Sequence, residues 1–265
     1  MNILYQGSGG AIGDLLLSSH YMFHQYCLGN KISVTIPENL REELKDLYAK
    51  HTFLENIIML KDISENPFLE YALKNGYEPS LYIKDVRFLK NAHFHPISEW
   101  MPYTCDPTIP AGCIGIHVCS SSNYARPKIP HLQSFIRDDH VAFFGTEADE
   151  ALFNTYYPDI RKTVPDELWR FGKDSLLQTF SNIRVCSGVV AFSSWSAYAA
   201  VLQGVPAIEL WYLDQWQQYA QLVAQMLGRP VHYVQCPHVM EQLVPLKYIF
   251  HRLNFYSKAL YETSH

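Results

Sequence analysis

Short apolar runs alternate along the chain with longer stretches that mix apolar and polar residues. The short runs predict buried strands, and apolar positions three and four residues apart predict helices between them. This alternation is typical of βαβ units with a mostly parallel sheet. The predicted strands are residues 3–5, 32–36, 57–60, 114–118, 141–144, 189–192 and 207–211, and the predicted helices are 40–48, 67–75, 196–203, 246–261 and one that starts at residue 14.

A cluster of prolines between residues 95 and 112 interrupts this alternation. Proline breaks regular structure, so the domain boundary is expected there. The sequence therefore predicts an α/β protein with a first domain at residues 1–100 and a second at 112–245. The apolar face of the last helix, at 246–262, is expected to pack back on the first domain.

Composition excludes several classes of protein. The formal net charge of -5 gives no general attraction for nucleic acid or an anionic membrane. The six cysteines form no CxxC pair and no regular framework, which argues against zinc clusters and disulfide scaffolds. No basic leader precedes the first strand, and no apolar run reaches the roughly 18 residues of a membrane span. A cytoplasmic protein without membrane insertion is expected.

A glycine-rich loop follows the first predicted strand at residues 7–13 and includes Gly10 and Gly13. Such a loop, entering a helix, offers backbone N–H groups to an anion, although a purely structural turn has the same pattern. It does not match a dinucleotide fingerprint, because Ile12 holds the sixth position. Asp14 follows at the expected helix start. Its spacing alone favours a helix cap over a general base, and both roles stay open.

Three later segments follow predicted strands and suit a nucleotide diphosphate. The loop after residue 118 combines hydroxyls with two cations, which can bind phosphate oxygens. Glu147 could accept from ribose hydroxyls or simply start a helix. The helix near residue 195 offers its positive end to a phosphate, while its serines could also be ordinary caps. The binding candidates in these segments are Ser120, Ser121, Arg126, Lys128, Glu147, Ser193, Ser194, Trp195 and Tyr198.

Other catalytic motifs are absent from the sequence. The fragments around His93 and His238 lack three well-spaced ligands, so no metal and no cofactor is expected. The GxSxG pattern of hydrolases and the Walker A loop are both missing.

Taken in order, these segments resemble the lipopolysaccharide heptosyltransferase family and its GT-B relatives. The stretch from Ile12 to Leu17 is similar to the family's opening motif, and the strand ending at His117 with its serines is similar to the phosphate loop. Residues 145–147 and 191–206 resemble the later nucleotide-binding motifs. The sequence departs where the family usually has Asp-Thr-Gly and then His, because it has Ser193, Ser194, Trp195 and Tyr198.

The resemblance implies two Rossmann-like domains facing a cleft. It also implies an inverting, metal-independent transfer of a sugar from a nucleotide-diphosphate sugar to an acceptor hydroxyl. Asp14 would be the catalytic base, and the second domain would hold the donor. The acceptor could be a glycan, a lipid-linked glycan or a modified nucleobase. The aromatic content of 14% suits stacking on a sugar or a base, but most aromatic residues are core.

Two alternatives of other classes stay open. A non-catalytic nucleotide- or glycan-binding module would keep the pocket without needing Asp14. A dinucleotide oxidoreductase would use residues 7–13 as its cofactor loop, and the missing glycine counts against it. The sequence does not fix the nucleotide, the sugar or the oligomeric state.

Overall fold

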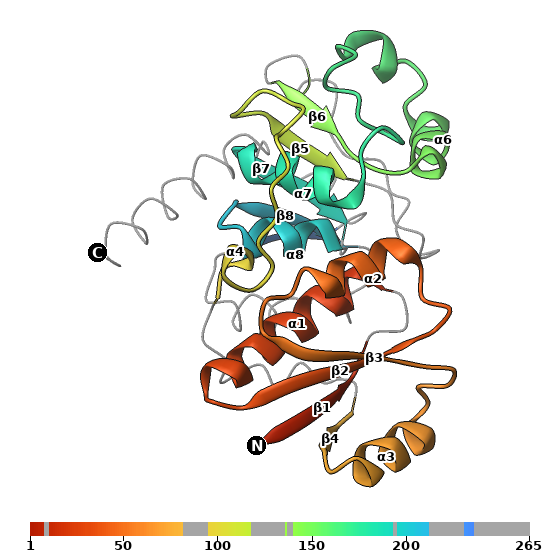
Figure 1. Cartoon of the computed structure of the whole chain (residues 1–265). Coiled ribbons are helices and arrows are strands. Elements are labelled where there is room, and N and C mark those ends of the chain that lie inside the picture. The colour runs from red at the N-terminus through yellow and green to blue at the C-terminus, as the bar shows by residue number, and fades with distance from the viewer. Residues whose placement is uncertain are drawn as a thin grey trace, which may run out of the picture. The chain divides into compact units, whose positions relative to one another are not determined.

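The computed structural model describes residues 1–7, 11–81, 95–117, 136, 140–192, 195–211 and 231–235. The described residues divide into two compact units at Thr104 and Cys105, inside the proline-bearing segment. Each unit has its own parallel sheet with helices (Figure 1). The predicted α/β class with parallel sheets is therefore confirmed. The last predicted helix lies outside the described residues.

The first unit alternates strands and helices as predicted. Its sheet has the order β3-β2-β1-β4, and all its pairs are parallel. Right-handed crossovers place α1 and α2 on one face and α3 on the other, as Figure 1 shows. The elements are β1 (Asn2–Gln6), α1 (Ile12–Cys27), β2 (Lys31–Pro37), α2 (Glu42–Ala49), β3 (Leu54–Leu60), α3 (Glu65–Lys74), β4 (Glu78–Ser80) and α4 (Ile97–Trp100).

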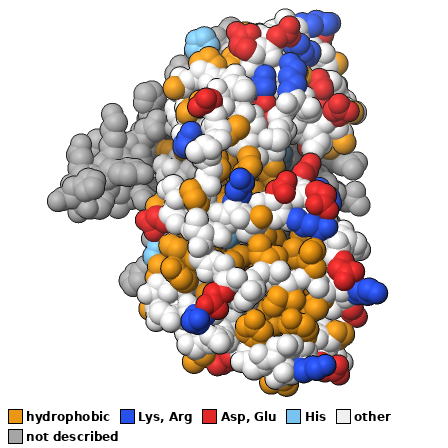
Figure 2. All heavy atoms as spheres, viewed as in Figure 1, with side chains coloured by type: hydrophobic (Ala, Val, Ile, Leu, Met, Phe, Trp, Pro, Cys, Tyr) orange, Lys and Arg blue, Asp and Glu red, His pale blue; other side chains and the backbone are white. Residues whose placement is uncertain are grey.

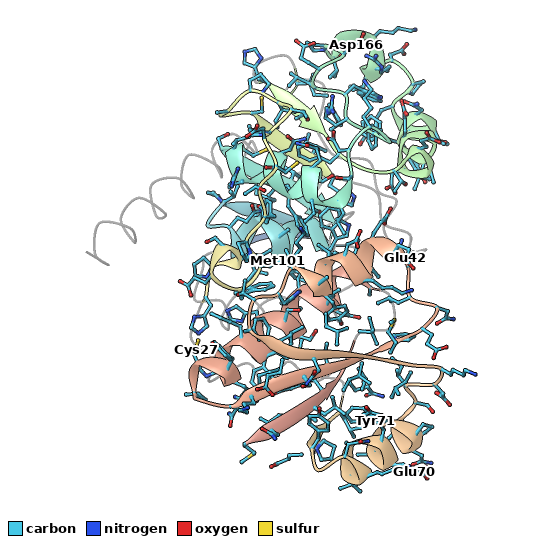
Figure 3. The ribbon with its side chains drawn as sticks, in the orientation of Figure 1. Cys27, Glu42, Glu70, Tyr71, Met101 and Asp166 are labelled. Carbon is cyan, nitrogen blue, oxygen red and sulfur yellow. The ribbon has the colours of Figure 1, made fainter. Side chains whose placement is uncertain are left out.

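Apolar side chains from helix and strand fill both faces of this sheet. The leucine run that follows Asp14 in α1 is buried. On the other face, Phe68 and Ala72 of α3 are fully buried against Leu4 of β1, and Tyr71 packs at the edge of this cluster (Figure 3). The helical spacing of Phe68 and Ala72 is the one that predicted α3.

Two buried histidines in this unit predict a pronounced acid sensitivity. Burial lowers the pKa of His20 from 6.5 to about 3, helped by repulsion from His95 and His24. Burial also lowers the pKa of His51 to about 4, against the opposing effect of its bonds to the Leu47 and Tyr48 carbonyls. Each native pKa lies below the unfolded one. The unfolded chain therefore binds protons first as the pH falls, and stability is lost below about pH 6.5.

We expect the free energy of unfolding to fall by up to about 1.4 kcal/mol per pH unit for each histidine in this window. Urea unfolding at several values between about pH 7 and 5 measures this slope. His51→Asn keeps an N–H for the Leu47 carbonyl, 2.7 Å from His51 Nδ1, but does not titrate. Its slope should be shallower than that of the wild type, and an equal slope would exclude His51 as a source.

The second unit has five parallel strands in the order β6-β5-β7-β8-β9. Helix α8 packs against β7, β8 and α7. The elements are β5 (Ile114–His117), β6 (Val141–Phe143), α6 (Glu147–Tyr156), the 3-10 helix η2 (Ile160–Thr163), α7 (Leu176–Val185), β7 (Gly188–Phe192), α8 (Trp195–Leu202), β8 (Ala207–Trp211) and β9 (Val231–Gln235).

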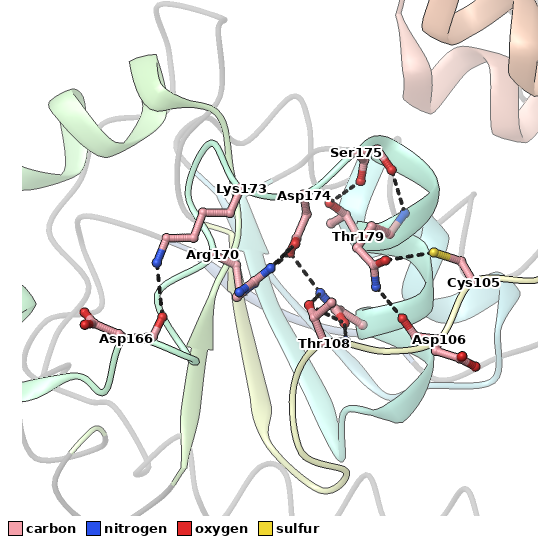
Figure 4. A network of polar contacts seen from close by, with 11 residues as sticks. Cys105, Asp106, Thr108, Asp166, Arg170, Lys173, Asp174, Ser175 and Thr179 are labelled. Atoms are coloured by element: carbon pink, nitrogen blue, oxygen red, sulfur yellow. Dashed lines mark hydrogen bonds and ion pairs between the residues drawn. The ribbon is translucent and has the colours of Figure 1, made fainter.

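A polar network ties the start of this unit to α7 (Figure 4). Asp174 accepts hydrogen bonds from the Arg170 guanidinium and, at 2.9 Å, from Asn182 Nδ2. Asn182 in turn accepts from the Thr108 backbone N–H at 2.7 Å, and Gln178 donates to the Asp106 carbonyl at 2.6 Å. Residues 106–108, just past the division between the units, are thereby fastened to α7.

Candidate functional site

The carboxyl end of β1 is the switch point of the first sheet. The connection from β1 leads through α1 to β2 on one side, while β4 lies on the other side of β1. Ligands of open α/β sheets bind beyond such a point, because the loops there diverge and leave a crevice. The glycine-rich segment begins at this end.

Gly7 is held close to the neighbouring strand. Its N–H donates to the Thr35 carbonyl oxygen at 2.8 Å. A Cβ on Gly7 would collide with that same oxygen and would lie 3.1 Å from the Tyr48 hydroxyl. Glycine at position 7 is therefore explained by packing. Gly13 is half-buried in the first turn of α1, and Gly10 lies outside the described residues.

Asp14 is the third residue of α1, because the helix begins at Ile12, two residues before the predicted start. The N-cap position belongs to Ala11, so Asp14 is not the cap that its spacing favoured. Within the described residues its half-buried carboxylate makes no hydrogen bond or ion pair. The positive end of the helix dipole attracts a carboxylate in this turn. Asp14 thus combines a favourable electrostatic position with a side chain that is not used for capping.

The second sheet has its switch point between β5 and β7, where the strand order reverses. Strand β5 ends at His117, and β7 ends at Phe192 just before α8. His117 Nδ1 lies 3.1 Å from Ser196 Oγ in the first turn of α8. The end of β5 and the start of α8 are thus joined by a hydrogen bond between residues that are far apart in the sequence.

His117 is almost fully buried at this point, with 4% of its surface exposed. Burial lowers its pKa, and the attraction of the Asp149 carboxylate opposes part of this effect. The ring is therefore neutral near pH 7, with one nitrogen that donates and one that accepts a hydrogen bond.

Trp195 opens α8 and is held by aromatic neighbours. Its ring centroid lies 5.3 Å from that of His117 and 5.6 Å from that of Phe180, to which it is T-shaped. Trp195 is half-buried, and Tyr198, three residues further along, is buried. The structure therefore places these two candidates together in the first turn of α8, the helix end whose dipole favours an anion.

Glu147 begins α6 beyond the carboxyl end of β6. Thr146 is the cap: its hydroxyl accepts from the Asp149 N–H, and its own N–H donates to the Asp149 carboxylate at 2.8 Å. This capping box leaves Glu147 exposed, and its carboxylate has no hydrogen bond within the described residues. The Glu147 side chain lies over Gly172, whose backbone has a φ of +66°.

The remaining candidates lie outside the described residues. They are Gly10, Ser120, Ser121, Arg126, Lys128, Ser193 and Ser194. Conversely, sequence reasoning left His117 and Ser196 out of the candidate set. A signal existed, because His117 is near the end of the predicted strand 114–118 and Ser196 starts the helix predicted after the strand 189–192. The carboxyl ends of parallel strands meet at one edge of a sheet.

In the part of the chain that the structure describes, no three His, Cys, Asp or Glu side chains are grouped so that they could hold a metal ion. No described helix is both long and apolar enough to cross a membrane.

Comparison with known proteins gives matches at the level of structure. No protein-family model matches the sequence, and no curated protein matches it either. ADP-heptose LPS heptosyltransferase II of E. coli superposes with a TM-score of 0.59 at 14% identity, over 98% of this chain and 99% of that one. The E. coli heptosyltransferase WaaC with ADP gives a TM-score of 0.55 at 12% identity, over 96% and 100% of the two chains.

A glycosyl transferase family 9 structure from Veillonella parvula DSM 2008 gives a TM-score of 0.55 at 12% identity, over 88% of this chain and 85% of that one. At such identities the likeness concerns the fold. The resemblance expected from the sequence is confirmed at that level, and the chain has the α/β fold of the heptosyltransferase structures.

Proposed function

We propose that this protein is a glycosyltransferase that moves a sugar from a nucleotide-diphosphate sugar to an acceptor hydroxyl. The observation that carries the proposal is the likeness in fold to heptosyltransferases over nearly the whole chain. One of these structures is a complex with ADP, and another is a complex with ADP-2-deoxy-2-fluoro heptose. Three candidate side chains support the proposal further, because each follows the carboxyl end of a strand. These are Asp14 after β1, Glu147 after β6 and Trp195 after β7.

In the proposed reaction, the acceptor oxygen attacks the anomeric carbon while the bond from that carbon to the diphosphate oxygen breaks. The acceptor proton passes to the Asp14 carboxylate, and the diphosphate leaves with the bonding electron pair. Direct displacement inverts the anomeric carbon. The positive end of the α8 dipole stabilises the departing charge together with Arg126 and Lys128, and this electrostatic role needs no metal.

The second unit binds the nucleotide in this proposal. Trp195 offers a half-buried ring at the switch point, held in place by His117 and Phe180. Glu147 offers an exposed carboxylate at the end of β6, the edge of the same sheet. A carboxylate in such a position accepts from both ribose hydroxyls in other nucleotide-binding α/β folds.

Glu147→Gln tests this assignment. The amide keeps the shape of the side chain but is a weaker acceptor for two hydroxyls, so nucleotide binding should weaken by about tenfold while binding of inorganic phosphate stays unchanged. Calorimetric titration with both ligands measures the difference. Glu65→Gln is a matched control, because Glu65 is also the exposed first residue of a helix, α3 in the first unit. Equal loss for both ligands would contradict a ribose contact.

Gly172→Ala provides a second test, through the backbone beneath Glu147. The added Cβ would lie 2.5 Å from Glu147 Cγ, so the carboxylate has to move. Gly112 has a similar positive φ of +87° with nothing within 4 Å of an added Cβ. Both alanine variants should lose about 1 to 2 kcal/mol of stability from the left-handed backbone. Only Gly172→Ala should also weaken nucleotide binding, and equal affinities in the two variants would contradict the proposal.

A further inference from the structure

His117 lies in the second sheet between the two strands whose following helices carry the described nucleotide candidates. Strand β5 ends at His117 and pairs with β6 on one side and with β7 on the other. Helix α6, with Glu147 at its start, follows β6, and α8, with Trp195 at its start, follows β7. Because the carboxyl ends of parallel strands meet at one edge of a sheet, His117 is placed beside the beginnings of both helices.

The imidazole of His117 interacts with side chains of both helices. Its Nδ1 lies 3.1 Å from Ser196 Oγ, and its ring centroid lies 5.3 Å from that of Trp195, the residue just before Ser196. The Asp149 carboxylate of α6 is close enough to act electrostatically on the same ring. His117 and Ser196 are both buried, so water does not compete for their hydrogen bond. The start of α8 is thereby fastened to the end of β5.

The position of the α8 start matters for the proposed reaction because a helix dipole acts over a short range. Its favourable effect on an anion falls off within the first turn. The net charge of -5 supplies no general attraction for an anion, and acidic and basic side chains are interspersed over the second unit on the face in view (Figure 2). A misplacement of about 1 Å can lower the rate of an enzyme by about 10²-fold. A residue that fixes the start of α8 therefore affects how the diphosphate is held.

We propose that His117 is a positioning residue for the nucleotide-diphosphate sugar, because its imidazole binds Ser196, contacts Trp195 and so holds the start of α8 in place for the diphosphate. The inference rests on the proposed function and adds a residue to it. His117 is almost fully buried, so it acts through Ser196 and Trp195. The bond to Ser196 governs the diphosphate end of the site, whereas Glu147 belongs to the ribose end. The two ends should therefore respond differently to substitution.

Calorimetry on the full chain with two kinds of probe tests this inference. The probes are inorganic pyrophosphate and whichever of ADP, UDP, GDP and dTDP the wild type binds most tightly. Ser196→Ala removes the hydroxyl that joins α8 to His117, so both probes should bind about tenfold more weakly. Glu147→Gln should weaken binding of the nucleotide alone, since pyrophosphate has no ribose.

Two substitutions of His117 separate positioning from the mere filling of space. Asparagine places a hydrogen-bonding group near the position of Nδ1 but lacks the ring, whereas alanine provides neither. His117→Asn should therefore bind pyrophosphate more tightly than His117→Ala does. It should bind more weakly than the wild type, because it no longer packs against Trp195. Ser196→Ala leaves the ring in place, so it tests the hydrogen bond independently of these two variants.

Ser181→Ala is the matched control, because Ser181 is a fully buried serine of α7 in the same unit and its hydroxyl donates to the Cys105 carbonyl. It should lower the midpoint of urea unfolding but bind both probes like the wild type. Wild-type affinity for pyrophosphate in Ser196→Ala overturns the inference and leaves the proposed function standing. So do equal losses of affinity in Ser196→Ala and Ser181→Ala, or a wild type that binds a nucleotide but not pyrophosphate. A wild type that binds none of the four nucleotides contradicts the proposed function, and the inference falls with it.

Discussion

Replacing Asp14 with asparagine is expected to lower sugar transfer by about 10²- to 10⁴-fold, the contribution typical of a positioned proton acceptor. The affinity for the nucleotide-diphosphate sugar should stay unchanged, because the donor is bound by the second unit in the proposed function. The fold should be unaffected as well, since Ala11 holds the cap position of α1 and the Asp14 carboxylate makes no bond within the described residues. Steady-state kinetics and calorimetry measure the two quantities separately.

Asp46→Asn is the control for this experiment, because Asp46 is an exposed carboxylate on α2 of the same unit. It should keep wild-type turnover. If Asp14→Asn also kept wild-type turnover, the catalytic assignment would be wrong. A protein that binds nucleotide-sugars but transfers nothing to the acceptors offered would instead be a binding module, the alternative that the Ser193-Ser194-Trp195 departure left open.

Removing Asp174 is expected to cost about 3 to 5 kcal/mol of folding free energy, as breaking a buried ion pair does. Only 3% of the Asp174 side chain and 15% of the Arg170 side chain are exposed. In Asp174→Ala, the Arg170 guanidinium loses its partner in a site that water reaches poorly. The amide of Asn182 loses one of its acceptors and holds Thr108 less firmly (Figure 4). Urea unfolding measures the loss.

Asp166→Ala is the matched control. Asp166 also pairs with an arginine, Arg161, but it lies exposed in the second unit (Figure 3). Exposed ion pairs contribute little to stability, so this variant should unfold close to the wild type. Equal losses in the two variants would show that burial of the Asp174 pair does not matter.

The sequence predicted the elements whose own residues show the apolar run of a strand or the apolar spacing of a helix. Strands β1, β2 and β8 are short segments rich in apolar residues, and the structure has each of them within one residue of the prediction. Helix α7 was missed because buried polar residues, Thr179, Ser181 and Asn182, interrupt its apolar spacing. Strand β4 was missed because it has three residues and contains Pro79, which argues against a strand.

The candidate site was predictable where a residue lies directly beyond a strand or at a helix start, as Glu147 and Trp195 do. The contact between His117 and Ser196 was not, because it joins residues 79 positions apart and depends on β5 lying beside β7. Strand order follows from the packing of the whole unit, so it cannot be read from the apolar and polar positions within one segment. The N-cap of α1 was misplaced for a different reason, since Ala11 has no capping side chain to reveal it.

Binding of nucleotide-diphosphate sugars to the wild-type chain tests the central claim most directly. Calorimetry with ADP-, UDP-, GDP- and dTDP-sugars should show saturable binding of at least one of them, with one site per chain. The same ligand should raise the midpoint of thermal unfolding, because it binds only the folded state. Absence of binding by all four classes of donor would contradict the proposed function.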